Sequence, residues 1–124
     1  MNILLVEDHE LNVDMLKRRL ERRGCTVDVA RDGAAALAKA ATGEFNLILM
    51  DIGLPDMSGL EVTAQLRARE ITRRIPIVAL TAHALVGDRE RALAAGCDDH
   101  AAKPVDLNAL INTMARLMRR EKRA

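Results

Sequence analysis

The sequence predicts an α/β fold in which helices cover both faces of one parallel sheet. Five apolar segments of strand length alternate with five segments of helical periodicity along the 124 residues. Three of the strand segments are apolar for most of their length, which is typical of parallel strands buried on both faces. Because a chain of this length supports one hydrophobic core, we expect a single domain over residues 1–124.

Five segments are expected to form strands, at 2–7, 26–30, 46–51, 75–81 and about 98–102. In the second segment Asp28 lies between Val27 and Val29, and this mixture of polar and apolar residues favours an edge strand. Right-handed crossovers join consecutive parallel strands. The predicted architecture is therefore a flavodoxin-like, doubly wound sheet of five parallel strands in the order 2-1-3-4-5, with five helices.

Helices are expected between the strands, at 11–23, 33–42, 59–69, 85–95 and 107–121. Gly24, Gly43 and Gly96 each follow a helical segment, at the position where a left-handed residue commonly ends a helix. Asp32 and Asp106 precede helical segments and are expected to act as N-caps. These residues delimit the predicted helices.

The predicted helices differ in how well they can pack. In the last helix, apolar residues recur at the spacing of one helical face: Leu107, Leu110, Ile111, Met114, Leu117 and Met118. The helix at 85–95 is rich in alanine, and only Leu85, Val86 and Leu93 are expected to anchor it as larger apolar residues. We therefore expect it to be the least firmly packed of the five.

Composition and charge argue against nucleic acid or membrane partners. The net charge is +1, and the chain has one phenylalanine and no tryptophan or tyrosine, so it lacks a platform for stacking bases. No segment is long and apolar enough to cross a membrane. Cys25 and Cys97 lie far apart in the sequence, as expected of reduced thiols. We therefore expect a cytoplasmic protein.

Polar groups stand where four of the predicted strands end. Glu7 and Asp8 follow the first strand, Asp51 ends the third, Thr81 ends the fourth, and Lys103 follows the fifth. In an open α/β sheet, ligands bind at the carboxyl ends of the strands. These five side chains are therefore expected to meet at one edge of the sheet.

Three carboxylates in one cleft repel one another, so their convergence indicates a bound cation. Mg²⁺ prefers oxygen ligands and usually keeps several waters. Asp8 and Asp51 suit direct ligation, and Glu7 suits binding through water. Thr81 can donate a hydrogen bond to a phosphoryl oxygen, and Lys103 can neutralise its charge. Asp51 can then act as a nucleophile, since a carboxylate forms an acyl phosphate.

With these segments, the chain resembles the receiver domain of two-component response regulators over essentially its whole length. The matching motifs are Val6-Glu7-Asp8, the ten residues Met50 to Gly59, Ala79-Leu80-Thr81-Ala82 and Ala102-Lys103-Pro104. Each motif is weak alone, but together and in this order they are highly specific.

The resemblance implies that Asp51 accepts a phosphoryl group from a phosphohistidine of a histidine kinase or a histidine phosphotransfer protein. It implies that the Gly53 carbonyl joins the three carboxylates around Mg²⁺, and that Thr81 and Lys103 contact the phosphate. It also implies a cis bond between Lys103 and Pro104. The protein is then a phosphoacceptor with residual autophosphatase activity and not a dedicated enzyme.

A second resemblance narrows the class. The segment Glu7 to Asn12 is similar to the opening of receivers in hybrid kinases and phosphorelays, and the chain as a whole is similar to stand-alone regulators of the DivK type. The resemblance implies that the fourth helix, fifth strand and fifth helix present the face that a downstream protein effector reads. The sequence does not indicate which effector this is.

One position departs from the pattern of the family. Receivers usually carry tyrosine or phenylalanine three residues before the lysine, as a switch coupled to the threonine, and this chain has His100 there. We expect Thr81 and His100 to form the switch, with an output that is sensitive to pH because histidine titrates near neutrality.

Other functions are consistent with parts of the sequence. A receiver fold can serve as a protein-binding module without phosphorylation, and the chain can be a receiver fragment of a hybrid histidine kinase. A phosphatase of the haloacid-dehalogenase type also uses an aspartate nucleophile, but it needs a second aspartate where this chain has Gly53. A flavin carrier needs a phosphate loop after the first strand, where this chain is acidic.

Overall fold

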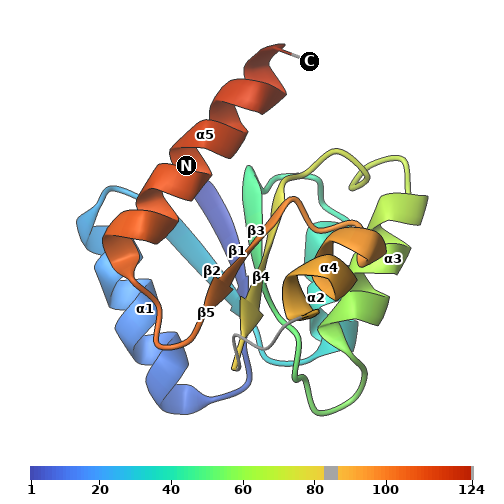
Figure 1. Cartoon of the computed structure of the whole chain (residues 1–124), viewed down its shortest axis with the longest axis horizontal. Coiled ribbons are helices and arrows are strands. Elements are labelled where there is room, and N and C mark those ends of the chain that lie inside the picture. The colour runs from blue at the N-terminus through green and yellow to red at the C-terminus, as the bar shows by residue number, and fades with distance from the viewer. Residues whose placement is uncertain (83–86, 124) are drawn as a thin grey trace.

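The computed structural model describes residues 1–82 and 87–123, and only the backbone of residues 121–123. Its strands are β1 (Asn2–Val6), β2 (Thr26–Ala30), β3 (Leu47–Asp51), β4 (Ile77–Thr81) and β5 (Asp99–Ala102). All pairs are parallel, and the order β2-β1-β3-β4-β5 confirms the predicted 2-1-3-4-5 sheet with β2 at one edge (Figure 1).

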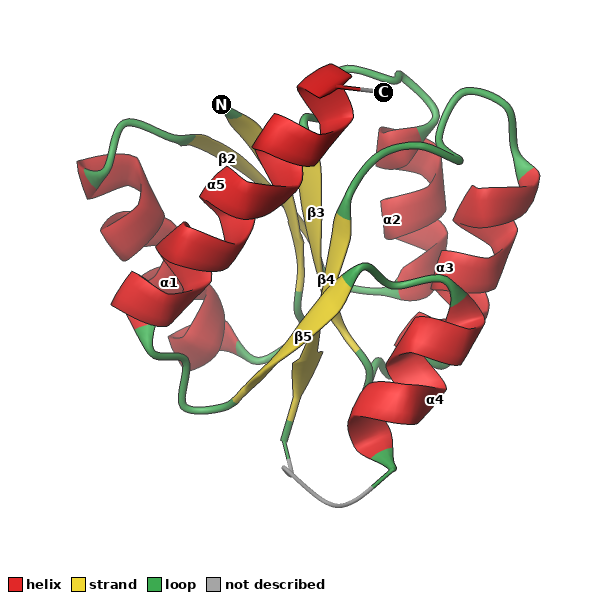
Figure 2. Ribbon diagram, turned by 45° about the horizontal axis from the view of Figure 1, so that its top comes forward, coloured by secondary structure: helices red, strands yellow, loops and turns green. Residues whose placement is uncertain are grey.

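Five helices connect or follow the strands in the described part of the chain. They are α1 (Glu10–Arg22), α2 (Gly33–Ala40), α3 (Gly59–Ala68), α4 (Asp88–Ala95) and α5 (Leu107–Arg123). Helices α1 and α5 cover one face of the sheet, and α2, α3 and α4 cover the other (Figure 2). This is the doubly wound arrangement that the alternation of elements predicts. No helix in the described residues is both long and apolar enough to traverse a lipid bilayer.

Each face of the sheet has its own hydrophobic core. On the side of α1 and α5, the core is built from large aliphatic side chains, including Leu16, Leu20, Leu110, Met114 and Leu117. The last three lie on the predicted apolar face of the final helix, which is therefore confirmed. On the other side, the fully buried side chains of α2 are alanines, with Leu37 packed against them, and larger buried residues come from the strands and α3. The nearly aromatic-free composition thus suffices for two covered faces.

The residues predicted to delimit helices do so. Gly24, Gly43 and Gly96 have φ angles of 87°, 71° and 113°, in the left-handed region. The Asp32 carboxylate accepts a hydrogen bond from the Ala35 N–H at 2.7 Å. The Asp106 carboxylate caps α5 in the same way and accepts a hydrogen bond from the Ala109 N–H at 3.2 Å. Each aspartate therefore satisfies an amide that the helix leaves unpaired.

Helix α4 differs from its predicted boundaries. It begins at Asp88, because its N-cap Gly87 has a φ of 102° that a helix interior does not accommodate. Leu85 and Val86, which were expected within it, lie outside the described residues. Leu93 is 38% exposed, so its expected role as an apolar anchor is wrong, and Ala92 is the buried residue of the helix. An alanine anchor is consistent with the weak packing expected here.

Candidate functional site

The predicted polar side chains meet at the carboxyl ends of the central strands. Glu7, Asp8, Asp51, Thr81 and Lys103 line one open cleft of about 500 Å³. Glu7 directly follows β1 and Asp51 ends β3, the strands that pair side by side in the centre of the sheet. Parallel strands of similar length end at the same edge, so residues 44 positions apart in sequence become neighbours.

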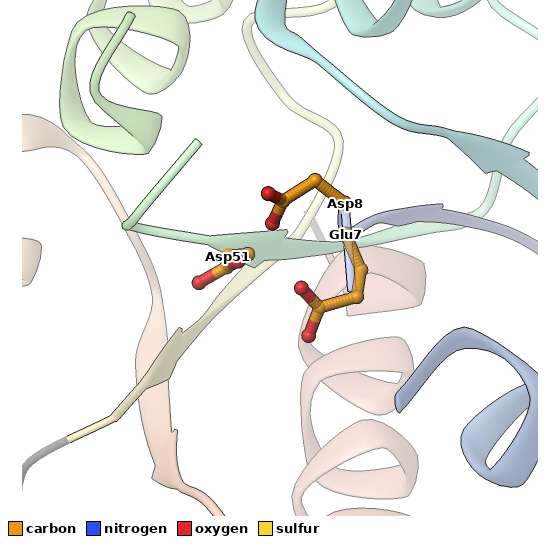
Figure 3. A group of neighbouring side chains, drawn as sticks. All are labelled: Glu7, Asp8 and Asp51. Atoms are coloured by element: carbon orange, nitrogen blue, oxygen red, sulfur yellow. The ribbon is translucent and has the colours of Figure 1, made fainter. Parts of the chain in front are cut away.

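Three carboxylates form the acidic part of this cleft. Glu7, Asp8 and Asp51 each offer an oxygen, and these oxygens all lie within 4.8 Å of one another. Figure 3 shows them gathered where β1 and β3 end. Glu7 and Asp51 are buried, with 1% and 5% exposure, whereas Asp8 is exposed and faces the solvent side of the cleft. An ion can therefore enter the cluster from the solvent on the side where Asp8 is exposed.

Lys103 ties two of these carboxylates together. Its Nζ lies 2.6 Å from Glu7 Oε1 and 3.3 Å from Asp51 Oδ1. The Lys103 N–H donates to the Thr81 carbonyl at 2.8 Å, which fixes the backbone just past β5 against the end of β4. The bond from Lys103 to Pro104 is cis, as the resemblance implies. The ammonium group is thereby held over the two buried acids.

The two buried carboxyl groups of this cluster have pKa values that are shifted in opposite directions. Burial, together with hydrogen bonding and repulsion from Glu7, raises the pKa of Asp51 to about 6. Burial alone raises the pKa of Glu7 too, but its contacts with Asp51 and Lys103 outweigh burial and lower the pKa overall. Burial opposes the charge of Lys103, yet the two carboxylates raise its pKa. At neutral pH the cluster therefore holds two buried negative charges against one positive charge.

The loop that follows Asp51 at the end of β3 is fixed at several points. The Gly53 N–H donates to Asp51 Oδ1 at 3.1 Å, and this orients the carboxylate. Gly59 begins α3 directly against the end of β3, where a Cβ atom would lie only 2.1 Å from the Asp51 carbonyl oxygen. Further along the loop, Asp56 accepts hydrogen bonds from the first amides of α2, at Gly33 (2.7 Å) and Ala34 (3.0 Å). These contacts hold Asp51 and the loop that follows it in a fixed position.

Two buried polar atoms lack a hydrogen-bond partner among the described residues: Thr81 Oγ1 and His100 Nδ1. Thr81 lines the cleft, and a buried hydroxyl without a partner is unfavourable, so this group is suited to a ligand. His100 lies on β5 beside β4, and its Nδ1 is 3.7 Å from Asp99 Oδ1, too far for a hydrogen bond.

Sequence reasoning did not assign several residues that contribute to the cleft. Asn12 donates to Glu7 Oε1 at 3.3 Å, and its place in the opening motif was the available signal. The N–H of His9 donates to the other oxygen of Glu7 at 3.3 Å. Asp88 and Arg91, an ion pair on α4, line the opposite rim. Nothing in the sequence marked this pair, because an exposed ion pair on a helix is common away from functional sites.

The residues present suit a divalent cation. The cluster consists of carboxylate oxygens, the hard ligands that Mg²⁺ and Ca²⁺ prefer, with one exposed member that leaves room for coordinated waters. The adjacent unpartnered hydroxyl and the ammonium group of Lys103 suit an anion beside that cation. A phosphoryl group in contact with Mg²⁺ has this combination of charges.

A family model for the response regulator receiver domain matches residues 3–115. The chain belongs to this family. As a receiver, it is 41% identical over 113 residues to the polar-differentiation response regulator DivK of Brucella abortus, covering 91% of this chain and 92% of DivK.

Solved receivers have the same fold. The receiver domain of the sensor histidine kinase PA1611 from Pseudomonas aeruginosa, with magnesium coordinated in its active site cleft, is 41% identical. It superimposes with a TM-score of 0.88 over 94% of this chain and 96% of that one. The receiver domain of Saccharomyces cerevisiae Ssk1, crystallised with the histidine phosphotransfer protein Ypd1, is 34% identical. Its TM-score is 0.85, over 92% of this chain and 86% of that one.

Other curated relatives are much longer than this chain. It spans 3%, 26% and 14% of the length of three of them, a hybrid kinase of Dictyostelium discoideum, a fission yeast response regulator and the Escherichia coli sensor ArcB. Receivers therefore occur both alone and within larger signalling proteins.

Proposed function

We propose that this receiver accepts a phosphoryl group on Asp51 from a phosphohistidine, with Mg²⁺ bound beside it. The observation that carries the proposal is the convergence of three carboxylates, the Lys103 ammonium and an unpartnered threonine hydroxyl in one cleft. The donor is a histidine kinase or a histidine phosphotransfer protein, in keeping with the complex of Ssk1 and Ypd1. The rest of the chemistry is assigned to residues of the chain.

The cation site consists of the carboxylates of Glu7, Asp8 and Asp51 and the carbonyl of Gly53. Bound there, Mg²⁺ supplies positive charge that neutralises the oxygens of the transferred phosphoryl group. It also lowers the repulsion among the carboxylates, which is needed because burial raises the pKa of Asp51 to about 6. The magnesium in the related PA1611 receiver supports this assignment.

In the transfer itself, an Oδ atom of Asp51 attacks phosphorus and forms an O–P bond while the P–N bond of the phosphohistidine breaks. The bonding electrons return to the imidazole nitrogen of the donor. Gly53 N–H and Lys103 hold Asp51 Oδ1, so the carboxylate is oriented before the donor arrives. Lys103 and Thr81 then bind oxygens of the acyl phosphate, which satisfies the buried hydroxyl of Thr81.

The acyl phosphate is also expected to hydrolyse slowly in place. Water attacks phosphorus, the bond to Asp51 breaks, and inorganic phosphate leaves. Gly53 is exposed and has no side chain, so the approach of water beside Asp51 is open. This residual autophosphatase activity resets the protein without making it a dedicated enzyme.

A surface for the protein donor lies next to the cleft. On α1, Leu11 and Met15 are 66% and 51% exposed, which is unusual for large apolar side chains. Met15 also lines a groove of about 150 Å³ together with Pro104 and Val105, and this groove shares Glu7 and Lys103 with the acidic cleft. A donor protein bound to this surface would lie next to Asp51, which its phosphohistidine must reach.

Phosphorylation is proposed to change the face formed by α4, β5 and α5, which a downstream protein reads. The Thr81 hydroxyl turns toward the phosphate, and His100 moves into the space that it leaves. His100 has a side chain that is 27% exposed and lacks a hydrogen bond at Nδ1, so little holds it in place. A beryllofluoride-bound structure in which His100 and α4 are unmoved refutes this switch.

The proposed location is the cytoplasm, since Cys25 and Cys97 are both free thiols. Within a longer hybrid kinase the same site would receive its phosphoryl group from a histidine of that protein. The much greater length of several relatives favours keeping this arrangement as the second candidate. The chemistry at Asp51 is the same in both.

Intact-mass analysis after incubation with acetyl phosphate and Mg²⁺ tests the proposal. Wild type is expected to gain one phosphoryl group, and Asp51→Asn none. Asp14→Asn, an exposed carboxylate on α1, is the matched control and is expected to label like wild type. Equal labelling of wild type and Asp51→Asn assigns the nucleophile to another residue. No labelling of any variant supports a binding module that acts without phosphorylation.

A further inference from the structure

A second cleft lies at the opposite edge of the sheet, where β4 and β5 begin. It has a volume of about 420 Å³, and its apolar lining residues are Pro76 and Leu117. Its polar lining consists of four arginines and one carboxylate: Arg67, Arg73, Arg74, Arg120 and Asp98. Pro76 directly precedes β4 and Asp98 directly precedes β5, so this cleft is separated from Asp51 by the length of the strands.

The walls of this cleft are fixed by Arg67 of α3. Its Nε donates to the Gly96 carbonyl at 2.8 Å, and its Nη1 donates to the carbonyls of Arg73 and Ile75 at 2.9 and 2.7 Å. Its Nη2 donates to Asp98 Oδ2 at 2.8 Å. One guanidinium thus joins the loop before β4 to the loop before β5. Most N–H donors of Arg67 form hydrogen bonds within the protein, so Arg67 stabilises the walls of the cleft and does not bind a ligand itself.

The only carboxylate among the lining residues is already engaged. Asp98 Oδ2 accepts hydrogen bonds from both Arg67 and the N–H of Ile77, the latter at 2.8 Å. Asp98 Oδ1 lies 3.4 Å from Arg120 Nη2, a long contact made by an arginine side chain that is 62% exposed. Arg120 is therefore weakly held and can turn toward another anion.

The two remaining arginines carry uncompensated charge. Arg73 and Arg74 are both exposed, and neither forms an ion pair with a carboxylate among the described side chains. With Arg120 they place three available guanidinium groups around one concave space. Such a group attracts a ligand with several negative charges, although the chain as a whole has a net charge of only +1.

We propose that this cleft binds a small polyphosphorylated molecule of the nucleoside di- or triphosphate class. The planar guanidinium fork matches pairs of phosphate oxygens, and Arg73, Arg74 and Arg120 are the ligands. The volume lies in the range of small-molecule sites. The apolar lining residues Pro76 and Leu117 suit contact with the nucleobase or the sugar that is attached to the phosphates. The site acts independently of Asp51, so it extends the proposed function without depending on it.

Titration of the full chain with ATP, GTP and inorganic triphosphate tests the proposal, with EDTA present so that no divalent ion occupies the acidic cleft. Calorimetry measures affinity, and amide chemical shifts locate the site. Shifts are expected at residues 73–76, 96–98 and around 120, with no change at 51–53. Nucleotides that bind more tightly than inorganic triphosphate identify a contribution of the base and sugar. Equal affinities identify the phosphates as the whole ligand, which overturns the nucleotide class.

Two double variants with the same change in net charge separate a site from general attraction. Arg73→Ala/Arg74→Ala is expected to weaken binding at least about tenfold, because it removes two charge-assisted contacts. Arg18→Ala/Arg89→Ala removes exposed arginines of α1 and α4 that do not line the cleft, and it is expected to change affinity by less than about twofold.

Both variants change exposed side chains, and melting curves verify that they remain folded. Equal loss in the two double variants, shifts centred elsewhere, or no binding at millimolar probe overturns the proposal. Asp51→Asn is expected to bind like wild type, so failure of this site and failure of phosphorylation are told apart.

Discussion

Removing the charge of Asp51 is expected to stabilise the protein when no divalent ion is present. The pKa of this carboxyl rises from an ordinary 3.8 to about 6, so the folded state disfavours the charged form. At about 1.36 kcal/mol per pKa unit, this difference corresponds to about 3 kcal/mol of lost stability above pH 6. Asparagine keeps the acceptor for the Gly53 N–H. Since it also weakens the contact with Lys103, we expect Asp51→Asn to gain about 1–3 kcal/mol at pH 7.5.

The sign of the pH dependence follows from the same shift. Because the folded state binds the proton of Asp51 more tightly than the unfolded state, the stability of wild type falls as pH rises between 3.8 and about 6. The advantage of Asp51→Asn is therefore expected to be about 1.4 kcal/mol smaller at pH 5 than at pH 7.5. Added Mg²⁺, which we propose binds folded wild type, is expected to narrow the gap at pH 7.5.

Urea denaturation at pH 5 and 7.5, with EDTA or Mg²⁺, measures these differences. Asp14→Asn provides the matched control, since this exposed carboxylate of α1 forms no ion pair among the described residues. Its stability is expected to stay within about 0.5 kcal/mol of wild type. If Asp51→Asn is less stable than wild type at pH 7.5 in EDTA, or if its advantage is the same at both pH values, the electrostatic reasoning is wrong.

Gly59→Ala is expected to lower the free energy of unfolding by about 1–3 kcal/mol, since its Cβ would lie 2.1 Å from the Asp51 carbonyl oxygen. Gly53→Ala, whose Cβ would meet nothing nearer than Asp51 Oδ1 at 4.0 Å, is its control in urea titrations, and an equal loss contradicts the steric argument. Arg67→Leu is expected to lower the free energy of unfolding by about 2–4 kcal/mol in the same assay, because it removes four hydrogen bonds. A decrease below about 1 kcal/mol contradicts the structural role of Arg67 between the loops before β4 and β5. The apparent affinity for Mg²⁺, followed by amide shifts, is expected to fall about tenfold per pH unit below 6 and to level off above it, and a constant affinity from pH 5 to 7.5 contradicts the raised pKa of Asp51.

Most of the fold and the composition of the site were predictable from the sequence. The strands were identifiable because buried parallel strands are apolar throughout, and their order brought Glu7 and Asp51 to neighbouring strand ends. The start of α4 was misplaced because Leu85 and Val86 fit a helical pattern as well as the residues that follow. Gly87, with its left-handed φ of 102°, was the signal for the observed start at Asp88.

The electrostatics of the site were not predictable. Glu7 and Asp51 are both carboxylates after buried strands, but the pKa of one is lowered and that of the other is raised. The difference depends first on the contact between the two carboxyl groups, which lowers the pKa of Glu7 and raises that of Asp51. It depends next on Lys103, which lies 2.6 Å from Glu7 and 3.3 Å from Asp51 and comes from a segment far away in sequence. The hydrogen bonds of Arg67 have the same origin, since they join residues up to 31 positions apart. Spacing along the chain does not contain this information.

The hydrogen bond from Arg67 to the Gly96 carbonyl restrains the C-terminal end of α4. It fixes the C-terminal end of this helix to α3, while the N-terminal end lies at the rim of the acidic cleft through Asp88 and Arg91. A helix held at one end and displaced at the other pivots about the fixed point. In the proposed switch, a small change beside Asp51 is therefore expected to tilt α4, with the largest displacement at its N-terminal end and the smallest at Gly96.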